Sequence, residues 1–99
     1  MDRLIALPQA RMEAKQLLVY IDLVELYEAD TLEKLIIKEY AYTYSIRQVL
    51  KIFKERGITK DNRAVEREDI VAVLKKKSAD PLHRIVRRMY MRKISHTKR

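Results

Sequence analysis

Apolar residues recur at steps of three and four through the middle of the chain, from Asp30 to Arg56. This spacing places them on one face of an α-helix. The stretch contains no glycine or proline before Gly57, so the pattern predicts one uninterrupted helix. At 1.5 Å per residue, such a helix would be roughly 40 Å long. A chain of 99 residues cannot cover a helix of that length on all sides, and we therefore expect a partner chain to bury its apolar face.

Three further helices are expected around the central one. Residues 4–20 have the spacing of an amphipathic helix. A short helix is expected to begin at Glu66, after a loop over residues 58–65, and it ends in a run of lysines that suits the helix dipole. A last helix should begin at Asp80 and Pro81, which are residue types favoured at the N-cap and at the first helical position. The chain is thus predicted to be all-α.

Positive charge is concentrated in the last quarter of the chain, whose formal net charge is +8 at pH 7. Residues 75–99 contain ten Lys or Arg residues and one acidic residue, a balance of +9, whereas residues 1–74 have a balance of −1. Such local charge suits nucleic acid or an acidic protein surface, and it is also compatible with a solvated helix face. The residues expected to contact nucleic acid or an acidic partner are Lys75, Lys76, Lys77, Arg84, Arg87, Arg88 and Arg92.

The composition offers little material for catalysis or metal binding. The chain has no cysteine and only two histidines, and His83 has no second histidine or carboxylate at ligand spacing. The carboxylates lack a histidine partner, a nucleophile setting or a glycine-rich loop. We therefore expect no enzyme, metal, cofactor or small-molecule substrate. No apolar run approaches the roughly 20 residues of a membrane span, so an intracellular protein without membrane contact is expected.

The order of a medium helix, a long central helix, a loop, a short helix and an added C-terminal basic helix resembles the histone fold. The most specific segment is Arg63-Ala-Val-Glu-Arg-Glu-Asp69-Ile-Val71. It resembles the second loop of histone-fold proteins, where an arginine precedes an Asp-Ile pair at the start of the next helix. The resemblance implies a charge-assisted pair between Arg63 and Asp69. It also implies a histone-fold domain over residues 1–77, followed by a basic C-terminal helix and tail over residues 78–99.

Within that fold, the sequence is similar to the subunit 13 family of the general transcription factor TFIID and to a related histone-fold subunit of the SAGA complex. The similarity lies within residues 12–91 and rests on three segments: Asp30-Thr-Leu-Glu-Lys-Leu-Ile-Ile37, Glu68-Asp-Ile-Val71, and Lys76-Lys-Ser-Ala-Asp-Pro81 followed by Arg84. The resemblance implies a nuclear protein that pairs with a histone-fold subunit of the subunit 11 type. Such a heterodimer belongs to an assembly that contacts TATA-binding protein and supports initiation by RNA polymerase II, with DNA contact through the basic tail as an open option.

In such a heterodimer the central helices of the two chains cross, and burial of apolar surface at the crossing would make the dimer the folded unit. The residues expected at this partner interface are Leu35, Ile36, Tyr40, Ile46, Val49, Leu50, Phe53, Ile70 and Leu74.

Three alternatives remain open. The first is a DNA-compacting, histone-like homodimer, although residues 1–74 are nearly neutral. The second is a helix-turn-helix DNA-binding module, in which the chain breaks near Thr43 and residues 66–77 form the recognition helix. The acidic start of that segment counts against base contacts, and a prokaryotic protein of this kind would be cytoplasmic. The third is a structural adaptor whose basic helix binds acidic protein.

Overall fold

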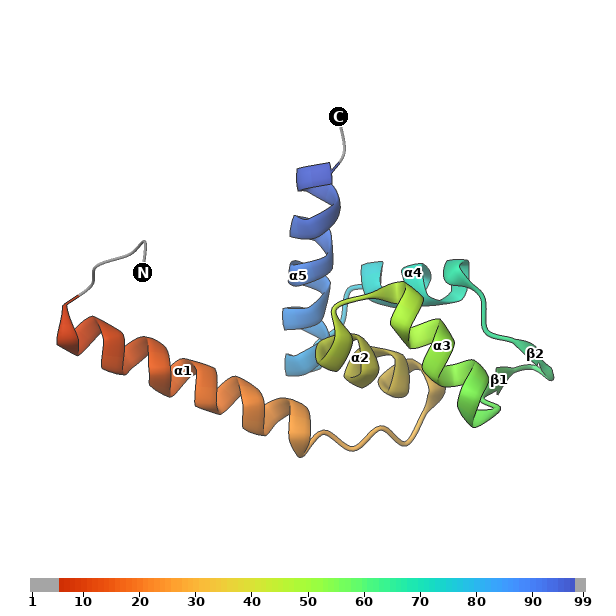
Figure 1. The fold of residues 1–99 in the computed structure, drawn as a ribbon, viewed down its shortest axis with the longest axis horizontal. Coiled ribbons are helices and arrows are strands. Elements are labelled where there is room, and N and C mark those ends of the chain that lie inside the picture. Colours follow the sequence, from red (N-terminus) through yellow and green to blue (C-terminus); the bar gives the residue numbers. More distant parts are fainter. Residues whose placement is uncertain (1–5, 98–99) are drawn as a thin grey trace.

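The structure is a computed structural model that describes residues 6–97, which form five helices and one β-hairpin (Figure 1). The elements in chain order are α1 (Leu7–Glu25), α2 (Leu32–Thr43), α3 (Ile46–Arg56), β1 (Thr59–Lys60), β2 (Arg63–Ala64), α4 (Arg67–Lys75) and α5 (Pro81–Thr97). The hairpin is antiparallel, with Thr59 opposite Ala64. The chain is therefore mostly helical, in agreement with the all-α prediction. The helix expected over residues 4–20 corresponds to α1; residues 4 and 5 lie outside the described part.

The stretch 30–56 forms two helices rather than one, and the break lies at Tyr44 and Ser45. Tyr44 adopts the left-handed conformation, with φ 54° and ψ 28°, and its N–H donates to the carbonyl of Tyr40 at 2.7 Å. Ser45 is extended, and its Oγ accepts from the N–H of Gln48 at 3.2 Å as the N-cap of α3. The prediction of one uninterrupted helix is therefore wrong. A left-handed residue and a capping serine can end one helix and start another without glycine or proline.

The break allows the three short helices α2, α3 and α4 to pack on one another. The long central helix that the histone-fold prediction requires is thus absent from the described residues. Seven of the nine residues assigned to a partner interface are instead buried in the core of this chain: Ile36, Tyr40, Ile46, Val49, Phe53, Ile70 and Leu74. Leu35 and Leu50 are half-buried against the same core. The chain itself covers the seven buried side chains, so their assignment to a partner interface was wrong, whereas the assignment of Leu35 and Leu50 stays a prediction.

Helix α5 completes the same core. Its residues Leu82, Val86 and Tyr90 are buried, and the ring of Tyr90 meets the ring of Tyr40 edge to face, with 6.1 Å between the centroids. The helix packs against both α2 and α4. The predicted domain boundary after residue 77 therefore falls inside one packed unit.

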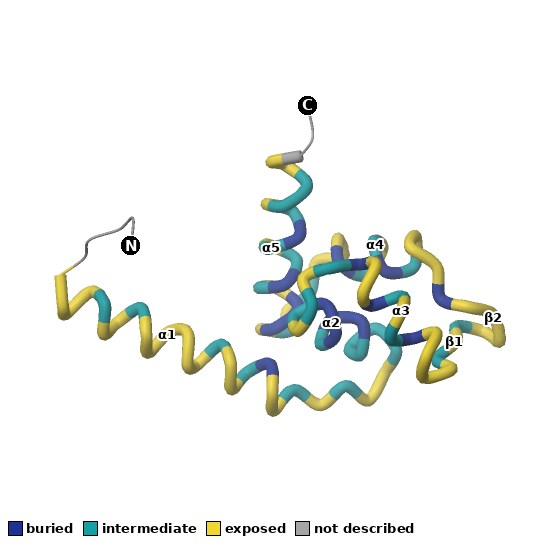
Figure 2. The backbone as a smooth tube through the Cα atoms, viewed as in Figure 1, coloured by how far each residue is buried: buried dark blue, intermediate teal, exposed yellow. Residues whose placement is uncertain are grey.

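Helix α1 projects away from this core, and Figure 2 shows most of its length as exposed. Its C-terminal end is fixed by a few contacts. The hydroxyl of Tyr20 donates to the sulfur of Met89 at 3.7 Å. The Nζ of Lys38 donates to the carbonyls of Glu25 and Tyr27 at 3.2 and 2.8 Å. The first part of α1 is thus held mainly by its own helical hydrogen bonds.

Replacing Ser45 by alanine should destabilise the protein by about 1 kcal/mol, because the substitution removes the oxygen that caps α3. In an uninterrupted helix, the same substitution would instead stabilise by roughly half a kcal/mol, since alanine has the higher helix propensity. Urea unfolding followed by circular dichroism measures the difference. Ser45→Asn keeps a capping oxygen and should retain the wild-type stability. A Ser45→Ala protein at least as stable as the wild type would contradict the observed break.

Candidate functional site

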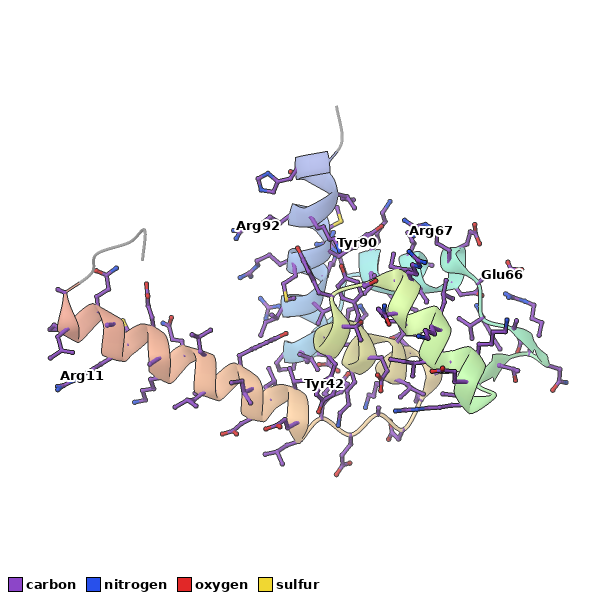
Figure 3. All side chains as sticks on the ribbon, viewed as in Figure 1. Arg11, Tyr42, Glu66, Arg67, Tyr90 and Arg92 are labelled. Atoms are coloured by element: carbon purple, nitrogen blue, oxygen red, sulfur yellow. The ribbon has the colours of Figure 1, made fainter. Side chains whose placement is uncertain are left out.

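Four arginines lie along one side of α5, and Figure 3 shows Arg92 directed away from the packed helices. Arg84, Arg88 and Arg92 are spaced by four residues and Arg87 follows Arg84 by three, so the four side chains lie on one side of the helix. The buried residues of α5 occupy the opposite face. Burial of that apolar face fixes the rotation of α5 about its axis, and the arginines consequently face solvent.

These arginines and Lys77 line a hollow of about 530 Å³ where the segment after α4 meets α5. Ser78 and Met91 complete the lining, which includes no carboxylate among the described residues. Five positive side chains around one hollow create a local positive potential that attracts anions. The structure thus brings together five of the seven basic residues singled out from the sequence. The other two lie elsewhere: Lys76 pairs with Glu33 at 3.0 Å, and Lys75 is exposed at the end of α4.

The start of α5 is fixed by Asp80, which acts as its N-cap. Its Oδ1 accepts from the N–H groups of Leu82 and His83 at 2.9 and 3.3 Å, and its Oδ2 accepts from the hydroxyl of Tyr27. The hydroxyl of Ser78 accepts from the N–H of Asp80 at 3.1 Å. The cap therefore connects α5 to the segment after α1 as well as to its own first turn.

Two side chains of α5 hold it against the end of α4. The Nε2 of buried His83 lies 2.7 Å from the carbonyl oxygen of Val73, so this nitrogen carries the proton and donates it. The Nε of Arg87 donates to the carbonyl of Lys75 at 2.8 Å. Both acceptor carbonyls belong to the last turn of α4, so these bonds link that turn to α5. Arg87 thus has a structural contact that the exposed arginines lack.

The predicted pair of Arg63 and Asp69 is present at the start of α4. The guanidinium of Arg63 donates to both carboxylate oxygens of Asp69, each at 2.9 Å. The same carboxylate accepts from Lys60 at 3.3 Å and from the N–H of Glu66 at 2.8 Å. The hydrogen bonds from Arg63 and Glu66 hold the pKa of Asp69 well below its ordinary value. The β-hairpin is thereby tied to the start of α4.

A second positive site lies where α3 begins, in a hollow of about 270 Å³ lined in part by Arg47, Arg67 and Lys93. The Nζ of Lys93 donates to the carbonyl of Tyr44 at 2.7 Å and lies 4.1 Å from the centroid of its ring. The N-terminal end of α3 adds its partial positive charge. This group could not be recognised from the sequence, because its members come from three helices and no spacing along the chain relates them.

Among the described residues, no group of three His, Cys, Asp or Glu side chains is placed to hold a metal ion. None of the helices in this part of the chain is both long and apolar enough to cross a bilayer.

Comparisons of the chain with protein-family models, with curated proteins and with solved structures found no match.

Replacing Arg87 by glutamine should destabilise the protein by about 1 kcal/mol, because it removes the charged donor to the last turn of α4. Arg88→Gln is the matched control, since Arg88 is the next residue and is exposed on the same face. The control should stay within about 0.5 kcal/mol of the wild type. Thermal and urea unfolding measure both variants. Equal stability of the two variants would contradict the positioning role of Arg87.

The lowered pKa of Asp69 predicts a loss of stability in acid. In the unfolded chain this carboxyl has a pKa of about 3.9, so the folded state binds fewer protons than the unfolded state and stability rises with pH. The contribution is fully present above that unfolded value and is lost as the pH falls toward the lower folded value. The difference in unfolding free energy between wild type and Asp69→Asn should be constant near neutral pH and shrink below about pH 4. Urea unfolding at a series of pH values measures it; a difference that does not change with pH would count against the pair.

Proposed function

We propose that this protein binds the phosphate backbone of double-stranded DNA with the solvent face of α5. The observation that carries the proposal is the cluster of Arg84, Arg87, Arg88, Arg92 and Lys77 around one hollow, to whose lining the described part of the chain contributes no carboxylate. Arginine matches phosphate oxygens with two parallel hydrogen bonds, and it keeps its charge at any physiological pH. A face of this kind is suited to anions that repeat along a line.

The length of the arginine face fits several phosphates of one duplex. From Arg84 to Arg92 the helix rises by about 12 Å. A DNA strand carries one phosphate for roughly every 3.4 Å of axis, so the face extends along a run of phosphates. The positive hollow at the start of α3 supplies further charge for the same kind of ligand. Contacts of this type neutralise the backbone and do not depend on base sequence.

Base reading by α4, as in a helix-turn-helix protein, is less well supported. The packing of α2, α3 and α4 and the break after Thr43 favour that architecture. However, the connection between α3 and α4 covers residues 57–66, longer than the usual turn of three or four residues. The N-cap Glu66 and Glu68 of the first turn of α4 are both exposed. These carboxylates would meet the negative backbone at the place where base contacts should begin.

Heterodimerisation as a TFIID-like histone-fold subunit stays a prediction. The sequence supported it through the resemblance of three segments to that family, and through the long helix expected over residues 30–56 with an apolar face left for a partner. That stretch forms two helices, and the apolar face lies in the core of the chain. The basic face of α5 does not depend on that resemblance, and it is the feature on which the DNA proposal rests.

Affinity for a labelled duplex should fall steeply with salt and be nearly equal for unrelated sequences. If all five cations of the face contact phosphates, the slope of log K against log salt should approach about −4.5. The triple substitution Arg84→Gln, Arg88→Gln and Arg92→Gln should reduce the magnitude of that slope by up to about 2.7 and weaken binding to every sequence. Fluorescence anisotropy at several salt concentrations provides both quantities.

The matched control removes the same charge from other surfaces: Lys15→Gln, Lys51→Gln and Lys54→Gln, all at exposed positions. This control should keep the wild-type slope. If both triple variants lowered the affinity for duplex DNA equally, binding would depend on the net charge of the protein rather than on α5. A wild-type protein that binds an acidic polypeptide but not duplex DNA would overturn the proposal in favour of an adaptor role.

A further inference from the structure

The projecting part of α1 exposes large apolar side chains. Leu17 and Leu18 are each 63% exposed, and Ile21 is 46% exposed. The core-facing side of the same helix is formed by other residues, among them Tyr20 and Leu23, which pack against the core. A cluster of exposed apolar residues on a protruding helix marks an interaction surface. The apolar side chains on the outward side of α1 are therefore exposed to solvent, where a partner could bury them.

The outward apolar residues follow a heptad repeat. The spacing between them alternates between three and four residues along Leu7, Ala10, Ala14, Leu17 and Ile21. This is the spacing of the a and d positions in a coiled coil, which form a narrow seam along one side of a helix. Leu18 lies beside the seam, near the middle of α1. The surface is thus shaped for another helix laid along it.

The charges that flank the seam identify that second helix. Arg11 lies seven residues before Leu18, and Glu25 lies seven residues after it. Seven residues are nearly two turns, so these three side chains share one side of α1; Figure 3 shows Arg11 on the projecting part. In an antiparallel pair centred on Leu18, Arg11 of each copy meets Glu25 of the other copy. In a parallel pair the equivalent flanking positions of the two copies lie on opposite sides of the seam, so Arg11 of one copy would not meet Glu25 of the other.

We infer that α1 pairs antiparallel with α1 of a second copy of this chain, about a two-fold axis that passes near Leu18. The interface is isologous, because each copy presents the same seam and both members of the charge pair. Leu17 and Ile21 of the two copies form its apolar centre. This inference rests on α1 alone and goes beyond the DNA proposal, which rests on α5.

The first test is the mass in solution of the full chain, by sedimentation equilibrium without DNA. The wild type should approach twice its 11.8 kDa mass as concentration rises. Leu18→Glu places two carboxylates at the two-fold axis and should give a monomer with unchanged helicity by circular dichroism. Val19→Glu is the matched control, since Val19 is the neighbouring residue, is 60% exposed and points away from the seam. This control should remain dimeric.

The second test reverses the flanking charges. Arg11→Glu and Glu25→Arg should each weaken the dimer by about tenfold, because each gives two like-charge pairs. An equimolar mixture of these two variants should form a heterodimer with the affinity of the wild type, and the double variant should recover as a homodimer. In a parallel pair, neither the mixture of the single variants nor the double variant would show this pattern.

A wild type that stays monomeric at every accessible concentration would overturn the inference. Equal disruption by Leu18→Glu and Val19→Glu would rule out the seam, and failure of the charge-reversed mixture to recover would rule out the antiparallel arrangement. Duplex binding by the Leu18→Glu monomer distinguishes the two proposals. A monomer that still shows a salt-dependent affinity supports DNA binding by α5 whatever the outcome for α1.

Discussion

The fold depends on the interruption at Tyr44 and Ser45. If α2 and α3 continued into each other, the apolar residues of both would lie along a rod, and one short chain could not bury them. The left-handed backbone of Tyr44 and the serine cap redirect the chain, so that α3 returns toward the residues that α2 buries. Lys93 of α5 also donates to the carbonyl of Tyr44, which ties the break to the last helix. As a consequence, a single chain can bury the apolar residues of α2 and α3 in one core.

The basic face of α5 follows from that core. The apolar side of α5 closes over α2 and α4, and this contact sets the direction in which the arginines point. The Asp80 cap, the His83 hydrogen bond and the Arg87 bond to the end of α4 fix the position of the helix. The positive charge is therefore carried by a rigid element rather than by a flexible tail. A preorganised row of cations loses less conformational freedom on binding than a mobile one.

Local signals along the sequence were sufficient for several features. Residue type was enough to predict the Asp80-Pro81 start of α5. The pair of Arg63 and Asp69 was expected from the resemblance of this segment to the second loop of histone-fold proteins, and its two members lie close in the chain. The position of the basic cluster also followed, because all but one of its members belong to one helix. These features need no knowledge of tertiary packing.

The break and the location of the apolar face could not be predicted in the same way. Apolar residues keep helical spacing across Tyr44, so the periodicity continues where the helix does not. Residues such as Phe53 and Ile70 fit the same apolar spacing whether their side chains are buried by their own chain or by another chain. The positive group at the start of α3 was missed for a related reason, because three helices meet there. The spacing of apolar residues indicates which side chains are buried. Only the tertiary packing shows which other residues bury them.

DNA binding by this protein is proposed to occur through the solvent face of α5. Amide chemical-shift mapping by NMR during titration with duplex DNA tests this claim most directly, because it locates the contact on the protein. We expect the largest shifts at Lys77 and along α5, around Arg84, Arg88 and Arg92. Largest shifts on the first turns of α4, or α5 resonances that saturating DNA leaves unchanged, would rule out backbone contact through this face.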